Sequence, residues 1–227
     1  MSRPEPVSRR ERPAKPALSR AAIVDAAMAV LEQDGIGKLT MRRVAAELDT
    51  GPASLYVYVA NTTELHALLL DRLLGSLDLT WDEVEPWRDR LHRVLGDYVE
   101  LVSREAGLAR AALFVWPDGP HYLDLVELIL RLLLAAGVDE RTAAWGVDLL
   151  LQHAGASVAE WSTRAADSGQ RLEDVAAQLD AADPERNPVL GSFDTALFTQ
   201  GHHTTRTLWA LEAVITGILD VRFPSAP

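Results

Sequence analysis

The residues from Gly51 to Tyr58 combine small side chains with hydroxyl groups, which suits contact with a phosphate backbone and with base edges. The segment reads Gly-Pro-Ala-Ser-Leu-Tyr-Val-Tyr. Small residues at its start let the backbone approach DNA closely, and the N–H groups of a helix N-terminus favour anions. Ser54 and Tyr58 stand four positions apart and therefore share one helical face. We interpret the segment as the helix of a helix-turn-helix that enters the major groove.

Two preceding helices should position that segment. Ser19 is placed to cap a first helix that stops at Gly35, and Thr40 is placed to cap a second one. The first helix is expected to bury Ile23, Ala26, Ala27, Val30 and Leu31, which recur at helical spacing. The second is expected to bury Met41, Val44, Ala45 and Leu48 and to expose Arg42, Arg43 and Glu47.

A tight turn over residues 48–51 separates the second helix from a third, which we expect from about Pro52 to Tyr58. Proline is best tolerated in the first turn of a helix, so Pro52 marks its start. Leu55 and Val59 point the same way and are predicted to join the core. Three short helices with a four-residue turn are the minimum for a helix-turn-helix.

The remainder of the chain predicts more helices, because no segment alternates long enough to demand a strand. Asn61 followed by Glu64 suggests a variant capping box that opens a fourth helix, long enough to bridge two domains. Later helices are expected near residues 91–102, 121–136, 141–166 and 203–221, with a polar, partly irregular stretch at 167–191. The predicted fold class is all-α. It comprises a flexible basic arm (1–17), a helix-turn-helix DNA-binding domain (18–62) and a larger helical ligand-binding and dimerisation domain (63–227).

The charge is distributed unevenly along the chain. The net charge is −11, but residues 1–62 hold nine Lys and Arg against seven Asp and Glu, whereas the remaining residues hold thirteen against twenty-six. A mildly basic head could meet phosphates while repulsion holds the acidic body away from DNA. The acidic body is also explained by solubility alone, and the arm is equally consistent with DNA contact or with a solvated tail.

Composition and motifs exclude several classes of protein. There is no cysteine, so disulfides, thiolate zinc sites and cysteine nucleophiles are excluded. We find no Gly-rich phosphate loop, nucleophile elbow or HExxH motif, and we therefore predict neither an enzyme nor a bound cofactor. The pair His202-His203 is too short to indicate a metal site. No uninterrupted apolar run is long enough to span a bilayer, so we expect a cytoplasmic protein without a membrane partner.

Residues Leu18 to about Leu70 resemble the TetR family of transcriptional regulators. The resemblance rests on a first helix that ends at Asp34-Gly35, on the segment 39–45 (Leu-Thr-Met-Arg-Arg-Val-Ala), and on 54–59 (Ser-Leu-Tyr-Val-Tyr-Val) followed by Asn61 and Glu64-Leu65. It implies that DNA is contacted by Arg42, Thr50, Gly51, Pro52, Ser54, Tyr56 and Tyr58. For the two tyrosines, packing is the alternative.

Two positions depart from the pattern of many relatives. Asp49 stands where they carry glycine, and aspartate tolerates a positive φ better than most residues. Thr62 stands where they carry a lysine that meets a phosphate at the start of the fourth helix. We expect the hydroxyl or the backbone N–H of Thr62 to take over that contact with DNA.

The second domain should hold an apolar pocket for a small-molecule effector of unknown identity. Its candidate lining residues are Tyr98, Phe114, Trp116, Leu130, Trp145, His153 and Trp161. Aromatic side chains with a few polar groups suit a hydrophobic or aromatic ligand. For each of them ordinary core packing is the alternative, and His153 in particular is compatible with a hydrogen-bonded core histidine.

The resemblance also implies a homodimer in which two late helices pair with their copies as a four-helix bundle, here residues 141–166 and 203–221. Such a dimer fits a palindromic double-stranded operator. We expect a repressor that the effector releases through the fourth helix, with activation by ligand as an open alternative. The rival functions are a constitutive architectural DNA-binding protein without effector and an enzyme built on the helical domain.

Overall fold

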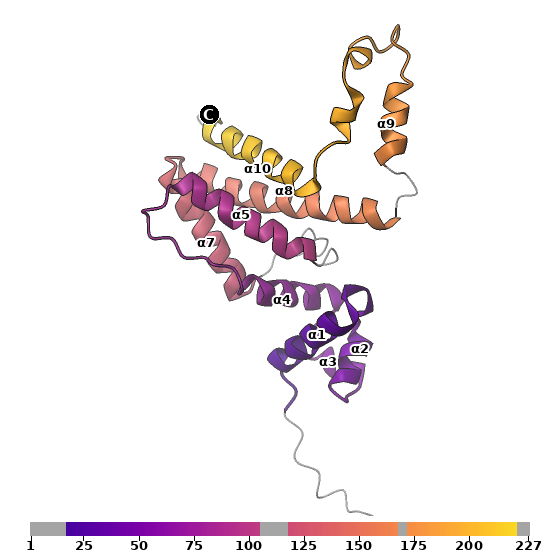
Figure 1. The fold of residues 1–227 in the computed structure, drawn as a ribbon. Coiled ribbons are helices and arrows are strands. Elements are labelled where there is room, and N and C mark those ends of the chain that lie inside the picture. The colour runs from indigo at the N-terminus through magenta and orange to yellow at the C-terminus, as the bar shows by residue number, and fades with distance from the viewer. Residues whose placement is uncertain (1–16, 105–117, 168–171, 222–227) are drawn as a thin grey trace, which may run out of the picture.

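The computed structural model describes residues 17–104, 118–167 and 172–221. In these ranges the regular structure is helical throughout, with nine α-helices, three short 3-10 helices and no strand. The all-α prediction is confirmed. Figure 1 shows a small N-terminal head, formed by α1 to α3, joined through α4 to a larger helical body. Among these residues no helix is both long and apolar enough to cross a membrane.

The head begins as the sequence predicts. Helix α1 spans Arg20–Asp34, with the Ser19 hydroxyl accepting the N–H of Ala22 and with Gly35 ending it at φ 73°. Helix α2 spans Met41–Glu47, and its cap Thr40 accepts the N–H of Arg43 at 3.1 Å. A 3-10 helix, η2 (Ile36–Lys38), joins them. These caps satisfy N–H groups that have no partner inside the helix.

Helix α3 is shorter than predicted, because it spans Pro52–Leu55 and not residues 52–58. The backbone continues as turns in which the N–H groups of Tyr58 and Val59 both bond the carbonyl of Leu55, at 2.9 and 3.0 Å. The β-branched Val57 and Val59 disfavour continuing the helix. The side chains of Leu55 and Val59 are fully buried, as expected.

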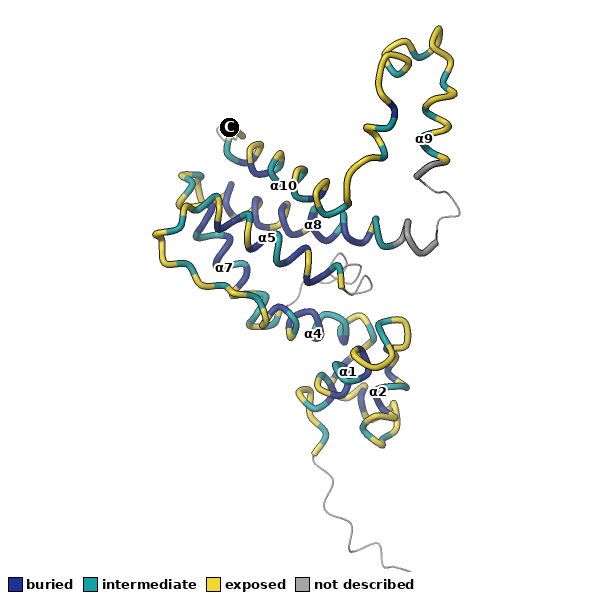
Figure 2. Tube along the Cα trace, in the orientation of Figure 1, coloured by how far each residue is buried: buried dark blue, intermediate teal, exposed yellow. Residues whose placement is uncertain are grey.

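Helix α4 (Thr62–Leu74) belongs to both hydrophobic cores of the molecule. Leu65 and Leu69 pack in the core of the head, whereas Leu70 and Leu74 pack in the core of the body. Figure 2 shows the buried face of this helix continuing from one to the other. A shift of α4 therefore moves contacts in both parts. The predicted domain boundary at residue 62 stays a prediction.

The body is built from four helices: α5 (Trp87–Arg104), α7 (Pro120–Ala135), α8 (Glu140–Asp167) and α10 (His203–Asp220). Leucine, isoleucine and valine side chains from these helices and from the end of α4 form its core. The observed ranges agree closely with the helices expected at 91–102, 121–136, 141–166 and 203–221. Figure 1 shows α10 lying along α8, on the side of the body away from the head.

The polar stretch after α8 contains more helix than the sequence suggested. Helix α9 spans Leu172–Asp180, and 3-10 helices η3 (Leu190–Ser192) and η4 (Thr195–Phe198) follow it. In Figure 1 this part of the chain projects away from the body before α10 begins. The side chains of Val189, Phe193 and Phe198 are exposed along it.

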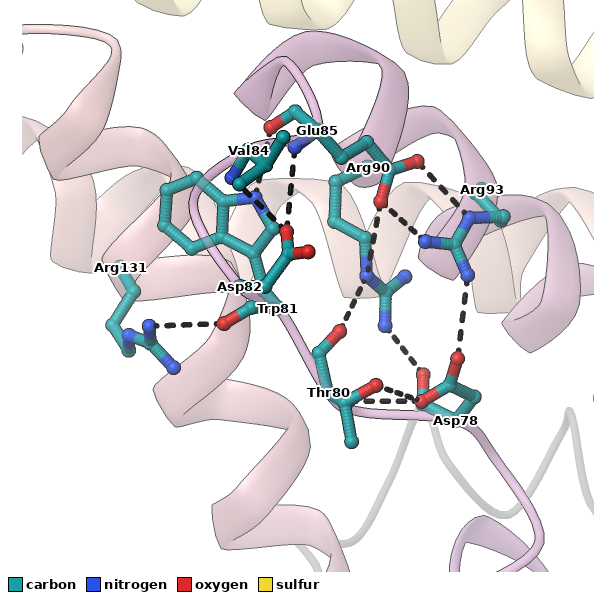
Figure 3. Close-up of polar contacts among 9 residues, drawn as sticks. All are labelled: Asp78, Thr80, Trp81, Asp82, Val84, Glu85, Arg90, Arg93 and Arg131. Carbon is teal, nitrogen blue, oxygen red and sulfur yellow. Dashed lines mark hydrogen bonds and ion pairs between the residues drawn. The ribbon is translucent and has the colours of Figure 1, made fainter.

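The connection between α4 and α5 is fixed by a buried arginine (Figure 3). Arg90 has no exposed side-chain surface, and it donates to the main-chain carbonyls of Asp78 at 2.5 Å and Thr80 at 2.9 Å. The indole N–H of Trp81 donates to the carbonyl of Glu85 at 3.0 Å, and the Arg131 guanidinium lies over the Trp81 ring. The loop is therefore held by specific polar contacts and not only by apolar packing.

Candidate DNA-binding and effector-binding sites

Most of the predicted DNA contacts of the helix-turn-helix are exposed on the surface of the head. Leu55 and Val59 hold α3 from beneath through the head core. The side chains around them face outward: Tyr56 is 53% exposed and Tyr58 40%. Arg42, Gly51, Pro52 and Ser54 are exposed as well, and Thr50 and Thr62 are half-buried. Neither tyrosine is therefore a core residue, and both keep a large part of their surface exposed.

Arg42 and Arg43 are neighbours on α2, but their side chains are engaged differently. Arg43 donates to Asp34 at 2.8 Å and to Glu47 at 2.7 Å. Hydrogen bonds to these two carboxylates raise the pKa of the Arg43 guanidinium. For Arg42 no ion pair is found within the described part of the chain. Arg42 is therefore the arginine of this pair that is available to a phosphate.

The turn between α2 and α3 adopts the conformation expected of a glycine position. Asp49 has φ 47°, one of two non-glycine residues with positive φ in the described ranges. The N–H of Thr50 then bonds the carbonyl of Ala45 at 2.8 Å and closes the end of α2. Aspartate is among the non-glycine residues that adopt this region of φ and ψ most readily, so the turn is preserved with Asp49 in place of glycine.

The start of α4 is hydrogen-bonded to α1 and to the loop that follows α3. Asn61 accepts the N–H of Glu64 at 2.8 Å, which confirms the predicted cap. The Glu64 carboxylate accepts the N–H of Ala60 at 2.6 Å and the guanidinium of Arg20 at 2.5 Å. Thr62, the first helical residue, lies within this arrangement. The contact with Arg20 could not be found from sequence, because 44 residues separate it from Glu64.

The predicted effector residues do not form one cluster among the residues described. Tyr98 is buried in the body core, and Leu130 is half-buried against it. Burial raises the pKa of the Tyr98 hydroxyl, to which the nearby Tyr122 contributes, so it stays protonated and able to donate a hydrogen bond. Phe114 and Trp116 lie outside the described residues.

His153 and Trp161 lie elsewhere, in an open groove of about 690 Å³ between α8 and α10. Ser157, Glu160, Leu197, Gln200, Thr205, Arg206, Thr207, Trp209 and Ala210 complete its lining. The Arg206 guanidinium lies over the Trp161 ring, and Ser157 is within 3.4 Å of His153. No group of three metal-binding side chains is found in the described ranges.

Trp145 is placed differently from the pocket that the sequence suggested. It lies on α8 with 61% of its surface exposed. Leu149 on the same helix is 45% exposed, and Trp209 on α10 is 74% exposed. An exposed tryptophan is not part of an enclosed cavity. The sequence shows that Trp145 and Leu149 stand four residues apart on one helical face, but this spacing does not tell whether that face is buried or exposed.

Two family models match this chain. One, for bacterial regulatory proteins of the TetR family, matches residues 23–67. The other, for a tetracyclin repressor-like C-terminal domain, matches residues 82–222. Together they cover the head and the body in the order in which the chain presents them.

Two curated proteins are similar over part of their length. The HTH-type transcriptional repressor DrrR1 of Streptomyces coeruleorubidus is 34% identical over 127 residues, which are 56% of this chain and 47% of that protein. An HTH-type transcriptional regulator of Saccharopolyspora erythraea is 31% identical over 135 residues, 60% of this chain and 56% of the relative. The chain thus spans about half the length of these curated relatives.

Two solved structures match more of the chain. The transcription regulator SCO7704 of Streptomyces coelicolor is 45% identical with a TM-score of 0.80, and the match covers 94% of this chain and 100% of that one. ActR of Streptomyces coelicolor in complex with actinorhodin is 29% identical with a TM-score of 0.78, over 89% of this chain and 97% of ActR. Because one family model matches the head and another matches more than half of the chain, this protein belongs to the TetR family of bacterial regulatory proteins.

Proposed function

We propose that the protein is a transcriptional repressor that binds a palindromic operator as a homodimer and is released by a small hydrophobic or aromatic effector. The observation that carries the proposal is the exposed surface of Arg42, Ser54, Tyr56 and Tyr58 around a buried Leu55. It joins a guanidinium, hydroxyl groups and a helix N-terminus on one head, a combination that suits phosphate and base-edge contacts.

The proposed dimer face lies on α8 and α10. Trp145, Leu149 and Trp209 expose large apolar surfaces there, and the groove between the two helices continues that face. Large exposed apolar patches mark interaction sites in proteins of this size. Pairing α8 and α10 with their copies would cover them and would present two heads to two half-sites.

The effector class is supported by the apolar character of the body. Tyr98 offers a protonated hydroxyl within a core of leucine, isoleucine and valine, and a core of this kind favours a mainly apolar ligand with one or two polar groups. The solved ActR complexes contain actinorhodin and (S)-DNPA. For the present protein, Tyr98 and Leu130, with Phe114 and Trp116, are the proposed effector contacts.

The first test is the selection of DNA from a random pool by the purified protein at a fixed salt concentration. An enriched inverted repeat supports a dimeric operator-binding regulator. Binding without sequence preference and with strong salt dependence would favour the architectural alternative. Once an operator is known, aromatic compounds are screened for release of the DNA, and the Leu130→Trp variant is compared with the wild type. If substitutions at Tyr98, Leu130, Phe114 and Trp116 all leave the release of DNA unchanged, the proposed effector site is removed.

A further inference from the structure

Helix α7 has no capping side chain of its own. Its N-cap is Gly119, and Pro120 follows at the first helical position without an N–H group. The first turn nevertheless has an acceptor, because the carboxylate of Asp71 on α4 accepts the N–H of Tyr122 at 2.9 Å. Asp71 thus caps a helix that begins 49 residues later in the chain.

The cap is built closely into both helices. Asp71 is only 9% exposed, and among the described residues it has no ion pair with a basic side chain. A Cβ atom at Gly119 would lie 2.0 Å from its Cγ, so only glycine leaves room for the carboxylate. The positive end of the α7 dipole and the N–H of Tyr122 therefore compensate a buried negative charge.

A second close approach lies one turn further along α4. A Cβ atom at Gly75 would come within 2.9 Å of the His121 ring, so the two helices also meet closely there. Tyr122, the residue that donates to Asp71, packs against the body core, and the buried Tyr98 belongs to that core. The first turn of α7 thus meets α4 and packs against the core that contains a proposed effector contact, Tyr98.

Asp71 also stands at the point where α4 passes from one core to the other. Leu69 belongs to the head core and Leu70 to the body core. The next residue, Arg72, reaches back to Asp25 of α1 at 3.1 Å, but both side chains of that pair are more than half exposed. The buried polar link of this junction therefore runs from α4 to the body and not to the head.

We propose that Asp71 couples the orientation of the DNA-binding head to the position of α7, as a positioning residue that acts through the Tyr122 N–H. The inference rests on the proposed function, because it assigns the residue through which effector and operator influence each other. Displacement of the first turn of α7 by a bound effector would pull α4 with it. Coupling is reciprocal, so operator binding must in turn change the first turn of α7.

The test uses the selected operator as its probe and needs no effector. Amide hydrogen exchange of residues 121–124 is measured on the full homodimer with and without operator, while fluorescence anisotropy reports DNA binding in the same samples. In the wild type we expect the operator to change exchange at Tyr122 by about fivefold or more, the lower end of usual coupling. In Asp71→Ser the shorter side chain cannot reach the N–H of Tyr122, and in Gly119→Ala the added methyl group displaces the carboxylate. In both variants we expect the operator to be bound without changing hydrogen exchange at Tyr122.

Two further variants separate coupling from general loss of structure. Asp71→Asn keeps an acceptor oxygen and is expected to retain the response, and Asp25→Ser, which breaks only the exposed pair with Arg72, is the matched control that leaves it intact. If one of the two variants Asp71→Ser and Gly119→Ala fails to fold, the other decides, by whether the exchange response at Tyr122 is lost while operator is still bound.

The other outcomes overturn either the coupling role of Asp71 alone or the proposed function together with it. Wild-type protein that binds operator without any change at residues 121–124 would remove the coupling role of Asp71 and leave the proposed function standing. A response of wild-type size in Asp71→Ser or Gly119→Ala would do the same. Wild-type protein that selects no operator would remove the proposed function, and the inference with it.

Discussion

The guanidinium of Arg90 on α5 donates to the main-chain carbonyl of Asp78, twelve residues earlier, from a position with no exposed side-chain surface. This bond closes the loop that joins α4 to α5 (Figure 3). Asp71 holds the same end of α4 to α7. Besides apolar packing, one buried polar side chain, Asp71, holds α4 itself to the body, and Arg90 holds the loop that follows it, whereas apolar packing and exposed ion pairs hold α4 to the head.

Replacing Arg90 by methionine should lower the free energy of unfolding by roughly 2 to 4 kcal/mol, because two main-chain carbonyl groups would lose the charge-assisted partner that the buried guanidinium supplies. Chemical denaturation at constant protein concentration measures the change. The matched control is Arg93→Met, since Arg93 is 43% exposed and its ion pairs with Glu85 and Asp78 are screened by solvent. We expect the control to cost at most about 1 kcal/mol. Equal costs for the two variants would contradict a special role for Arg90.

Replacing Arg42 by alanine should weaken operator binding, because Arg42 is exposed and is not engaged by a carboxylate within the described residues. One lost phosphate contact reduces the slope of log K against log salt by about 1. Fluorescence anisotropy at several salt concentrations measures both quantities. Arg43→Ala is the control, since Asp34 and Glu47 hold that guanidinium. A larger change in slope for Arg43→Ala than for Arg42→Ala would reverse the assignment.

Caps and periodicity explain why the head could be predicted well from the sequence. Ser19, Thr40 and Asn61 each bond an N–H group a few residues away, so the contacts that fix these helices are local. The positive φ of Asp49 follows from its place in a tight turn. The end of α3 was less predictable. The spacing of Leu55 and Val59 favours a helix that continues past residue 55, whereas the β-branched Val57 disfavours it.

The body was predictable as helices but not as a site. Asp71 stands among leucines on α4, and nothing near it in the chain indicates a partner 51 residues away. The aromatic residues of α5 and α8 could not be divided into core, groove and surface by type alone. Tyr98 is buried and Trp145 is exposed, although both are large aromatic residues within long helices of the body. Long-range packing decides between these positions.

Introducing a charge at Trp209 or Trp145 should dissociate the proposed dimer. Trp209→Glu and Trp145→Glu would each place an uncompensated carboxylate in an apolar interface, which costs several kcal/mol. We expect the dissociation constant measured by sedimentation velocity to rise by about 100-fold or more. Val84→Glu is the matched control, because Val84 is 84% exposed and lies on the α4–α5 connection, outside the two helices of the proposed interface. Dimers that are unaffected by both tryptophan variants would place the interface elsewhere.

His66 on α4 should make the stability of the protein depend on pH. Burial lowers the pKa of this histidine below its ordinary value of 6.5, and its Nε2 atom is buried without a hydrogen-bond partner among the described residues. The unfolded chain therefore takes up a proton that the native protein resists. As a result, the free energy of unfolding is largest above about pH 6.5 and decreases as the pH falls below it.

The measurement is denaturant unfolding of wild type and His66→Gln at pH 7.5 and pH 5.5, at one protomer concentration because unfolding is linked to dimerisation. Glutamine does not titrate, so the loss of stability between the two pH values should be smaller in the variant. It should not vanish, because burial and the adjacent His202 also lower the pKa of His203. An equal loss in both proteins would mean that His66 accepts a proton in the native state as readily as in the unfolded chain.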